Sequence, residues 1–350
     1  MKVVCYFKEP ASYTLALKKE VYDPLLIDAR FLESTSLASN NEVKALSNLS
    51  IINKNKQLWS DSKHYEAAIF NGFYQKELFL LLFFSWLQSN PLKVALDSDT
   101  PLNIPANPFK RMVKKILLNR LFKNKRIYGL AGGSGSHKEL FRYYGMKDNH
   151  IVLLPMVINV NEFQGKERKR EAQFEFLYVG RIEMHKNIRY LLETFREVFG
   201  NADSIRLKIV GGGSELAAFE KDFPDSNITF TGKLFDNKLK QAYKNASVLV
   251  LPSLFEPWGL VVNEAMASGL PVISSRFVGA NYDLIEGKGT GLIFDPEKEG
   301  DLKEKMLEMY CDKIQYEKFS ENAYNLMHNY WNYDLYKKQL LLAIEKMKNA

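Results

Sequence analysis

Short apolar runs alternate with helical patterns along the whole chain. In the first half, runs typical of buried strands lie at residues 3–7, 67–70, 94–96, 127–130 and 151–154. Between them, apolar residues recur at helical spacing over residues 13–20, 75–88, 108–121 and 137–144. Strands that alternate with helices in this way predict a parallel α/β sheet. The Asn-, Ser- and Lys-rich residues 31–63 fit this pattern only loosely.

The second half shows the same alternation more clearly. Six strands are predicted from the segments FEFLYVG (174–180), IRLKIVGGG (205–213), ITFTG (228–232), SVLVLPS (247–253), PVISS (271–275) and GTGLIF (289–294). Helices are expected from about Asn187, from Ser214, from a cap at Asp236 and from about Glu299. The pattern predicts a doubly wound sheet, and such sheets bind ligands at the carboxyl ends of their strands.

A polar segment between the halves predicts two domains. Residues 159–173 have the composition of a linker, with a hinge near residue 165. We therefore expect an amino-terminal domain (1–160) and a carboxyl-terminal domain (161–330), for which 350 residues are sufficient. Residues 331–350 are expected to form a helix that packs back toward the amino-terminal domain.

The composition is that of an ordinary globular protein, with 46% apolar and 25% charged residues. The two cysteines, Cys5 and Cys311, lack metal-ligand spacing and fit a reducing compartment. No cleavable signal peptide is visible, and no apolar run reaches the roughly 18 residues of a spanning helix. The run LFLLLFFSWL (78–87) predicts a core helix, with shallow membrane contact as the alternative. A cytoplasmic protein is expected.

The positive charge is concentrated in one segment. From Phe109 to Arg126 the chain carries eight Lys or Arg and no acid, whereas its net charge is +7. Apolar residues recur there at helical spacing, so the segment predicts a basic amphipathic helix. An anionic membrane surface is one partner for such a helix, and a solvated face of a core helix is the alternative. No nucleic-acid-binding module accompanies the basic charge.

Two carboxylates surround a predicted helix start in the segment PSLFEPWGLVVNEAMASGLPV (252–272). Glu256 precedes the turn Pro257-Trp258-Gly259, and Glu264 lies inside the helix that follows. The free N–H groups of such a helix start favour a phosphate. A carboxylate inside the helix can accept hydrogen bonds from two neighbouring hydroxyls. Two cations, Arg181 and Lys186, follow an earlier strand and suit a diphosphate, and two ordinary surface residues of a loop are the alternative.

Four segments together resemble glycosyltransferase family 4, the group 1 glycosyltransferases. They are VGRIEMHKN, LKIVGGGSEL, ITFTGKL and PSLFEPWGLVVNEAMASGLPVISS, and EPWGLVVNE resembles the E-x7-E motif of that family. The resemblance covers residues 151–294. It implies retaining enzymes of the α/β GT-B fold, in which two Rossmann-like doubly wound parallel-sheet domains face a central cleft.

The resemblance also implies a role for each residue of the motifs. Arg181 and Lys186 would bind the diphosphate and neutralise the leaving group, and Glu256 would contact the donor sugar. Glu264 would bind the ribose hydroxyls. The remaining donor-binding residues would be the backbone of Trp258, Gly259 and Leu260, the turn at Gly212, and Lys233 and Leu234 near the base.

The amino-terminal half departs from the family pattern. KEPASYT replaces the usual glycine-rich loop after the first strand, and PMVIN (155–159) replaces a Pro-Asn-Gly stretch. DSDT (97–100) stands where the family often has a His-Asp pair. Asp97 or Asp99 could bind a sugar hydroxyl or cap the next segment.

The expected function is sugar transfer from a nucleotide-diphosphate sugar, UDP- or GDP-linked, to a glycan or a lipid-linked saccharide. The expected setting is bacterial surface polysaccharide synthesis, at the inner face of the plasma membrane or free in the cytoplasm. The expected enzyme is of the hexosyltransferase type and needs no metal or other cofactor. The alternatives are a GT-B sugar-nucleotide epimerase and a non-catalytic GT-B binding protein.

Overall fold

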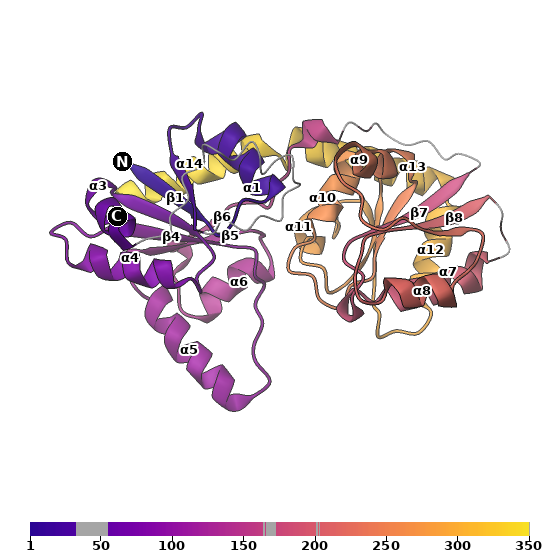
Figure 1. Cartoon of the computed structure of the whole chain (residues 1–350), viewed down its shortest axis with the longest axis horizontal. Helices are drawn as coiled ribbons and strands as arrows, with labels where there is room; N and C mark the ends of the chain where they lie inside the picture. Colours follow the sequence, from indigo (N-terminus) through magenta and orange to yellow (C-terminus); the bar gives the residue numbers. More distant parts are fainter. Residues whose placement is uncertain (33–54, 164, 166–172, 201, 203, 350) are drawn as a thin grey trace. The chain divides into compact units, whose positions relative to one another are not determined.

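The computed structural model describes residues 1–32, 55–163, 165, 173–200, 202 and 204–349, which form two compact units. The first unit comprises Met1–Met156 and Tyr333–Ala350, and the second comprises Val157–Asn332. Figure 1 shows a sheet flanked by helices in each unit. The predicted hinge near residue 165 falls among residues 164 and 166–172, which lie outside the described chain.

The first unit is built on six parallel strands in the order β2-β1-β3-β4-β5-β6. In register, Cys5 of β1 lies opposite Ala29 of β2 on one side and Ile69 of β3 on the other. The strands are β1 (Val3–Phe7), β2 (Asp28–Phe31), β3 (Ala67–Asn71), β4 (Lys93–Ser98), β5 (Ile127–Ala131) and β6 (Ile151–Leu153).

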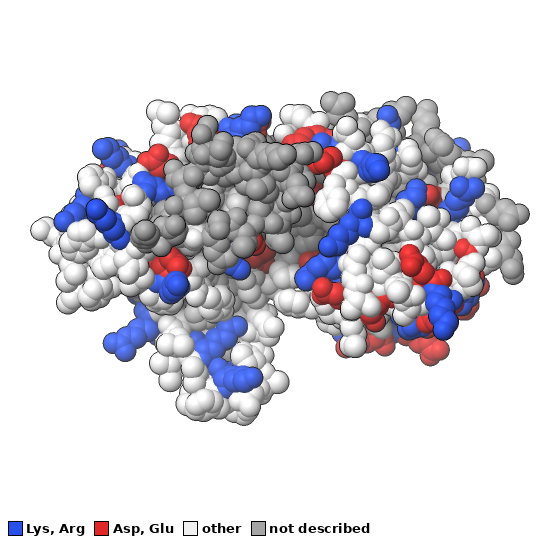
Figure 2. Space-filling model, viewed as in Figure 1, with Lys and Arg blue, Asp and Glu red and all other residues white. Residues whose placement is uncertain are grey.

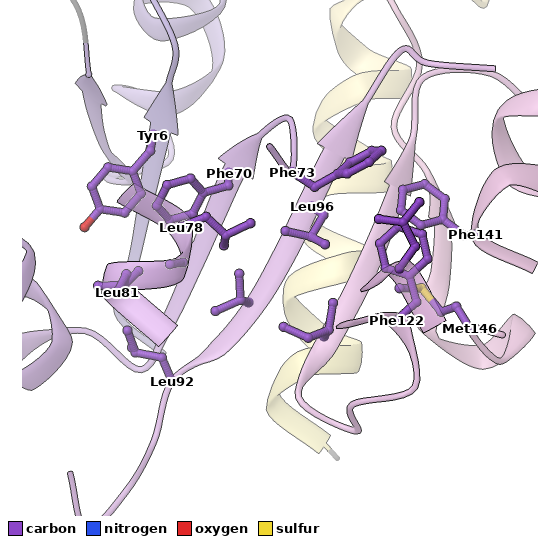
Figure 3. Packing of buried hydrophobic residues seen from close by; sticks show 14 of the residues in the cluster. Tyr6, Phe70, Phe73, Leu78, Leu81, Leu92, Leu96, Phe122, Phe141 and Met146 are labelled. Atoms are coloured by element: carbon purple, nitrogen blue, oxygen red, sulfur yellow. The ribbon is translucent and has the colours of Figure 1, made fainter. Parts of the chain in front are cut away.

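Helices cover both faces of this sheet. On one face lie α3 (Asn55–His64), α4 (Lys76–Trp86), α5 (Pro108–Phe122) and α6 (Ser136–Tyr143). The other face carries α1 (Ser12–Leu17), the π-helical turn η1 (Lys18–Tyr22) and α14 (Tyr333–Asn349), with the 3-10 turn η3 (Asp148–His150) before β6. Figure 3 shows the core beneath the first face, where Tyr6 stacks on Phe70 with ring centroids 4.5 Å apart. Figure 3 also shows Phe122 beside Phe141 in this core.

The second unit repeats the parallel α/β plan with a different strand order, β12-β11-β10-β7-β8-β9. Its strands are β7 (Phe174–Val179), β8 (Ile205–Val210), β9 (Ile228–Phe230), β10 (Val248–Leu251), β11 (Val272–Ser275) and β12 (Gly291–Phe294). Its helices are α7 (Ile188–Phe199), α8 (Leu216–Asp222), α9 (Asp236–Asn245), α10 (Leu260–Ala267), α11 (Asn281–Leu284), α12 (Asp301–Cys311) and α13 (Lys313–Asn329), with 3-10 turns η4 (Val160–Glu162) and η5 (Met184–Lys186).

The structure confirms the two sheets and corrects some element limits. β2 was not predicted, because its four residues alternate in exposure and include two charges. The helix expected from Ser214 begins at Leu216, and Asp236 is the first residue of α9 rather than its cap. No helix among the described residues has both the length and the apolar character needed to cross a bilayer.

Candidate active site

The strand order of the second unit reverses between β7 and β10. Strands β7, β8 and β9 run outward on one side, and β10, β11 and β12 run outward on the other. Loops that leave two such neighbouring strands diverge, which opens a crevice at their carboxyl ends. The segments that follow β7 and β10 carry Arg181, Lys186 and Glu256. The three residues predicted to act in catalysis therefore follow the strands between which this sheet type binds ligands.

The loops after β7 and β8 touch each other through backbone atoms. Ile182 N–H donates to the Gly212 carbonyl at 3.0 Å. A Cβ atom added at Gly213 would lie 2.0 Å from the Ile182 carbonyl oxygen, so a side chain there would separate the loops. Gly212 lies beside Lys233, since its added Cβ would be 3.1 Å from Lys233 Cε. Leu234 is half-buried next to Lys233.

Arg181 presents an exposed guanidinium directly after β7. Its side chain is 68% exposed and pairs with Glu183 at 3.0 Å. The Arg181 carbonyl accepts a hydrogen bond from the Tyr178 hydroxyl at 2.7 Å, which anchors the backbone while the side chain stays accessible. Such a guanidinium can bind two phosphate oxygens at once.

Lys186 and Glu256 form an ion pair, a contact that the sequence did not predict. Their side chains are only 10% and 15% exposed. The pair joins the turn η5 to the segment after β10. A backbone hydrogen bond also holds these segments together, since Leu254 N–H donates to the His185 carbonyl at 2.9 Å. Two buried opposite charges compensate each other, whereas either alone would be costly.

The amino end of α10 is positioned by a glycine and a buried tryptophan. Gly259 precedes the helix with a φ of 93°, a conformation that favours glycine. The Trp258 indole is buried, donates to Asn263 Oδ1 at 2.8 Å and stacks on Trp331 with centroids 5.8 Å apart. Val262 N–H donates to the Gly259 carbonyl at 2.9 Å, whereas the N–H groups of Leu260 and Val261 have no carbonyl partner within the helix. They can therefore bind an oxyanion.

Glu264 lies in α10 with its carboxylate held by a tyrosine of α9. The Tyr243 hydroxyl donates to Glu264 Oε2 at 2.6 Å. Burial raises the pKa of Glu264 to about 7, the hydrogen bond from Tyr243 opposes the rise, and the negative charge of Glu162 adds to it. The Glu264 carboxylate therefore changes its charge near neutral pH.

Sequence reasoning missed the groups that hold these residues in place. Tyr243, Asn263 and Trp331 each contact a predicted site residue or its neighbour. Tyr243 precedes Glu264 by 21 positions. No local pattern relates the two, because only the packing of α9 beside α10 brings them together.

In the first unit, Asp97 and Asp99 lie at the carboxyl end of β4. Asp97 is buried and accepts a hydrogen bond from Asn71 Nδ2 of β3 at 3.1 Å. Its carboxylate therefore joins two strands. Burial raises the pKa of Asp97 to about 7, Asn71 opposes this, and the charge of the exposed Asp99 adds to it. Burial, followed by the charges of Asp99 and Asp97, raises the pKa of Tyr13.

The second unit matches the sequence model of a known family. The sequence model of the family described as "Glycosyl transferases group 1" matches residues 159–326. This part of the chain belongs to the group 1 glycosyltransferases. The matched range contains the ten residues predicted for catalysis and donor binding in the second unit.

Curated relatives of this glycosyltransferase domain include enzymes with different names. "Sulfoquinovosyl transferase SQD2" of Arabidopsis thaliana is 29% identical over 240 residues, which are 64% of this chain and 46% of the relative. "Probable sucrose-phosphate synthase" of Thermosipho melanesiensis is 27% identical over 221 residues, 60% of this chain and 51% of the relative. The chain thus spans about half the length of these curated relatives.

Solved structures resemble the whole chain. Anabaena Alr3699/HepE in complex with UDP has a TM-score of 0.76 at 16% identity. The alignment covers 99% of this chain and 100% of the HepE chain. WaaG, described as a glycosyltransferase involved in lipopolysaccharide biosynthesis, has a TM-score of 0.66 at 15% identity. The alignment covers 97% of this chain and 98% of the WaaG chain. At this identity the likeness shows the fold, which is GT-B as the sequence predicts.

Proposed function

We propose that this chain transfers a sugar from a nucleotide-diphosphate sugar to a saccharide acceptor, with retention of configuration at the anomeric carbon. One observation carries the proposal. Arg181, Lys186, Glu256 and the amino end of α10 follow the two strands at which the sheet order reverses. Cations, free N–H groups and a carboxylate are the groups that a sugar diphosphate requires.

The chemistry follows from where charge develops. As the bond between the anomeric carbon and the diphosphate oxygen breaks, its electron pair moves to the diphosphate and the sugar becomes oxocarbenium-like. The acceptor hydroxyl oxygen then bonds to the anomeric carbon on the face that the diphosphate leaves, and its proton passes to the released diphosphate. Arg181, Lys186 and the amino end of α10 stabilise the growing negative charge. An arriving diphosphate competes with Glu256 for the Lys186 ammonium. We infer that this competition releases the Glu256 carboxylate toward the sugar.

The donor is proposed to be a UDP- or GDP-sugar that needs no metal ion. The solved HepE structures contain UDP and UDP-glucose, which favours UDP as the first nucleotide to test. The two cations supply positive charge where other transferases use a divalent ion. A chelator should therefore leave activity unchanged, and activity that is lost with chelator and restored by magnesium or manganese would refute the metal-free mechanism.

The decisive experiment follows donor binding and turnover in one preparation. Thermal-shift measurements with UDP, GDP and ADP identify the base, and the matching sugar nucleotides are then tested for turnover with saccharide acceptors. A product with the donor's anomeric configuration, observed by NMR, supports the proposal. An epimerised sugar nucleotide would show an epimerase, and binding without turnover would show a non-catalytic protein.

The acceptor is proposed to be a glycan or lipid-linked saccharide of bacterial surface polysaccharide synthesis. The exposed basic helix α5 supports a place at the inner face of the plasma membrane. It carries five of the eight cations of residues 109–126, and these can bind anionic lipid. This attachment is separate from donor chemistry, since the donor-binding residues lie in the second unit.

A further inference from the structure

Helices α4 and α5 expose apolar side chains on a projecting part of the first unit. Figure 1 shows α5 extending away from the sheet. Five apolar residues of α5, between Phe109 and Leu117, are exposed, from 36% for Val113 to 69% for Phe109. On α4 and at its end, Phe79, Phe83, Trp86 and Leu87 are at least half exposed. Exposed apolar patches of this kind mark binding surfaces.

A cleft of about 470 Å³ lies between these two helices. Phe73, Tyr74 and Phe79 line it from the side of α4, and Val113, Leu117 and Leu121 line it from the side of α5. The charged residues among its lining are Lys110 and Lys114. The cleft therefore combines apolar walls with two cations, a composition suited to a hydrocarbon chain with an anionic head.

The cations around the cleft are not neutralised. Within the described residues, the ion pairs of the first unit involve other cations, such as Arg30 and Arg142, and none involves the eight Lys and Arg from Phe109 to Arg126. The Lys114 ammonium instead donates to the Asn103 carbonyl at 2.8 Å, and burial lowers its pKa. Figure 2 shows blue and white atoms over α5, with no red among them on this face.

This charge decides between the possible occupants. A second copy bound symmetrically through this face would bring the two copies' Lys110 and Lys114 close together, because such an interface pairs a patch with itself. A neutral apolar peptide would leave the cations uncompensated. A phosphate-bearing lipid satisfies both features, since its chain fills apolar walls and its phosphate pairs with lysine.

We propose that the α4–α5 cleft binds the hydrocarbon chain of a phosphate-bearing lipid, with Lys110 and Lys114 against the phosphate. Lipid-linked saccharide acceptors belong to this class of lipid. Only the step that identifies the bound lipid with the acceptor rests on the proposed function. The lipid site itself stands on the cleft and its charges. UDP binding is measured in parallel, so a failure of the lipid site and a failure of sugar transfer are distinguishable.

The experiment measures binding of dodecyl phosphate, below its critical micelle concentration, to the full chain by titration calorimetry. Val113→Ser with Leu117→Ser removes apolar contacts inside the cleft. Met112→Ser with Ile116→Ser is the matched control, because these residues have the same spacing on α5 and similar exposure but do not line the cleft. We expect saturable binding that falls at least about tenfold in the first variant and less than about twofold in the control.

A second comparison separates the chain from the head group. Lys110→Gln with Lys114→Gln should weaken dodecyl phosphate severalfold and leave the neutral dodecyl maltoside unaffected. Inorganic phosphate should bind far more weakly than dodecyl phosphate. UDP-induced thermal shifts should stay the same in every variant, which verifies folding.

Several results would overturn the proposal. They are the absence of saturable dodecyl phosphate binding, equal losses in the two serine variants, and inorganic phosphate binding as tightly as the lipid. An acidic peptide that binds the wild type as tightly as dodecyl phosphate, and competes with it, would indicate a protein partner instead.

Discussion

Lys186 and Glu256 neutralise each other in a largely buried part of the second unit. The sequence resemblance assigns them to different parts of the donor, the diphosphate and the sugar. Their direct contact means that neither charge can be changed without altering the other. The pair therefore couples phosphate binding to the placement of the carboxylate that is proposed to act on the sugar.

Glu256→Gln should separate these two effects. The variant keeps the size of the side chain but leaves Lys186 without its counter-charge, so UDP should bind as tightly as to the wild type or more tightly. Transfer should fall by about 10²-fold or more, a loss typical of removing one electrostatic contact in an active site. Isothermal titration and single-turnover rates measure the two quantities.

Glu183→Gln is the matched control for Glu256→Gln. Glu183 pairs with the other proposed diphosphate ligand, Arg181, but lies on an accessible surface. Its loss should change turnover by less than about fivefold, because exposed ion pairs contribute little. Equal losses of turnover in the two variants would contradict the proposal that the Glu256 carboxylate acts on the donor sugar.

Glu264 should make nucleotide binding dependent on pH near neutrality. Its pKa is about 7 in the folded chain, and its ionised form is the one that accepts ribose hydroxyls. UDP affinity should therefore rise between about pH 6 and pH 8 in the wild type. Glu264→Gln, measured over the same range, should lack this rise. Any pH dependence of UDP affinity that remains in the variant is due to titration of the nucleotide itself.

The same shift affects stability in a defined direction. The folded pKa of Glu264 lies above its ordinary value of 4.5. The free energy of unfolding that this group contributes is therefore present below about pH 4.5 and is lost as the pH rises through about 7. Tyr243→Phe removes the hydrogen bond that opposes the shift. It should move the midpoint of the UDP affinity profile to higher pH, and an unchanged midpoint would contradict the Tyr243–Glu264 coupling.

The family motif indicates candidate site residues from sequence alone, whereas the residues that contact them have no such signal. Glu256 and Glu264 stand out in sequence because they surround a Pro-Trp-Gly turn. Tyr243 stands out in no pattern, because a tyrosine in a polar helix has many uses. The contact between Asp97 and Asn71 likewise depends on strand register, which a single sequence does not specify.

Among the elements, the loops after β7 and β8 depend most on single glycines. The Cβ of Gly213→Ala would lie 2.0 Å from the Ile182 carbonyl oxygen, so the two loops must separate. We expect a lower melting temperature and weaker UDP binding, because the β7 loop carries Arg181. Thermal shift with and without UDP measures both effects.

Gly287→Ala is the control for backbone strain. Gly287 has a φ of 68°, but an added Cβ meets no atom within 4 Å. The substitution should cost about 1–2 kcal/mol of stability from conformation alone and leave UDP affinity unchanged. If both glycine variants lowered UDP affinity equally, loop contact would not explain the effect of Gly213→Ala.

Strands of the second unit were predicted well because buried parallel strands are continuous apolar runs. Limits of helices were less accurate, since α8 starts two residues after the expected Ser214. Helix α3 was missed in a polar region where few apolar residues mark a face. These errors lie where hydrophobic spacing is weak and tertiary packing decides the structure.

At the scale of the whole molecule, the charge on α5 predicts salt-dependent binding to membranes. Each Lys or Arg near an anionic bilayer contributes about 1 kcal/mol. Co-sedimentation with phosphatidylglycerol liposomes should therefore decrease as salt rises and should be lost when Lys110, Arg111, Lys114 and Lys115 become Gln. Donor hydrolysis without acceptor should be unaffected.

A second quadruple variant controls for net charge. Replacing Lys337, Lys338, Lys346 and Lys348 of α14 with Gln removes the same charge from another helix of the first unit. Liposome binding should persist in this variant. Equal loss in both variants would indicate attraction through overall charge, and equal binding to neutral liposomes would exclude an electrostatic attachment.

The return of the chain to the first unit has a consequence for biosynthesis. Helix α14 packs on β6 and η1, where the Tyr336 and Tyr22 hydroxyls lie 2.8 Å apart and Lys93 Nζ donates to the Met347 carbonyl at 2.5 Å. During translation, residues 333–350 emerge after the whole second unit. Domains fold as units when their residues are available. The second unit can therefore fold on the ribosome before the first unit is complete, so the order of folding need not follow the order of synthesis.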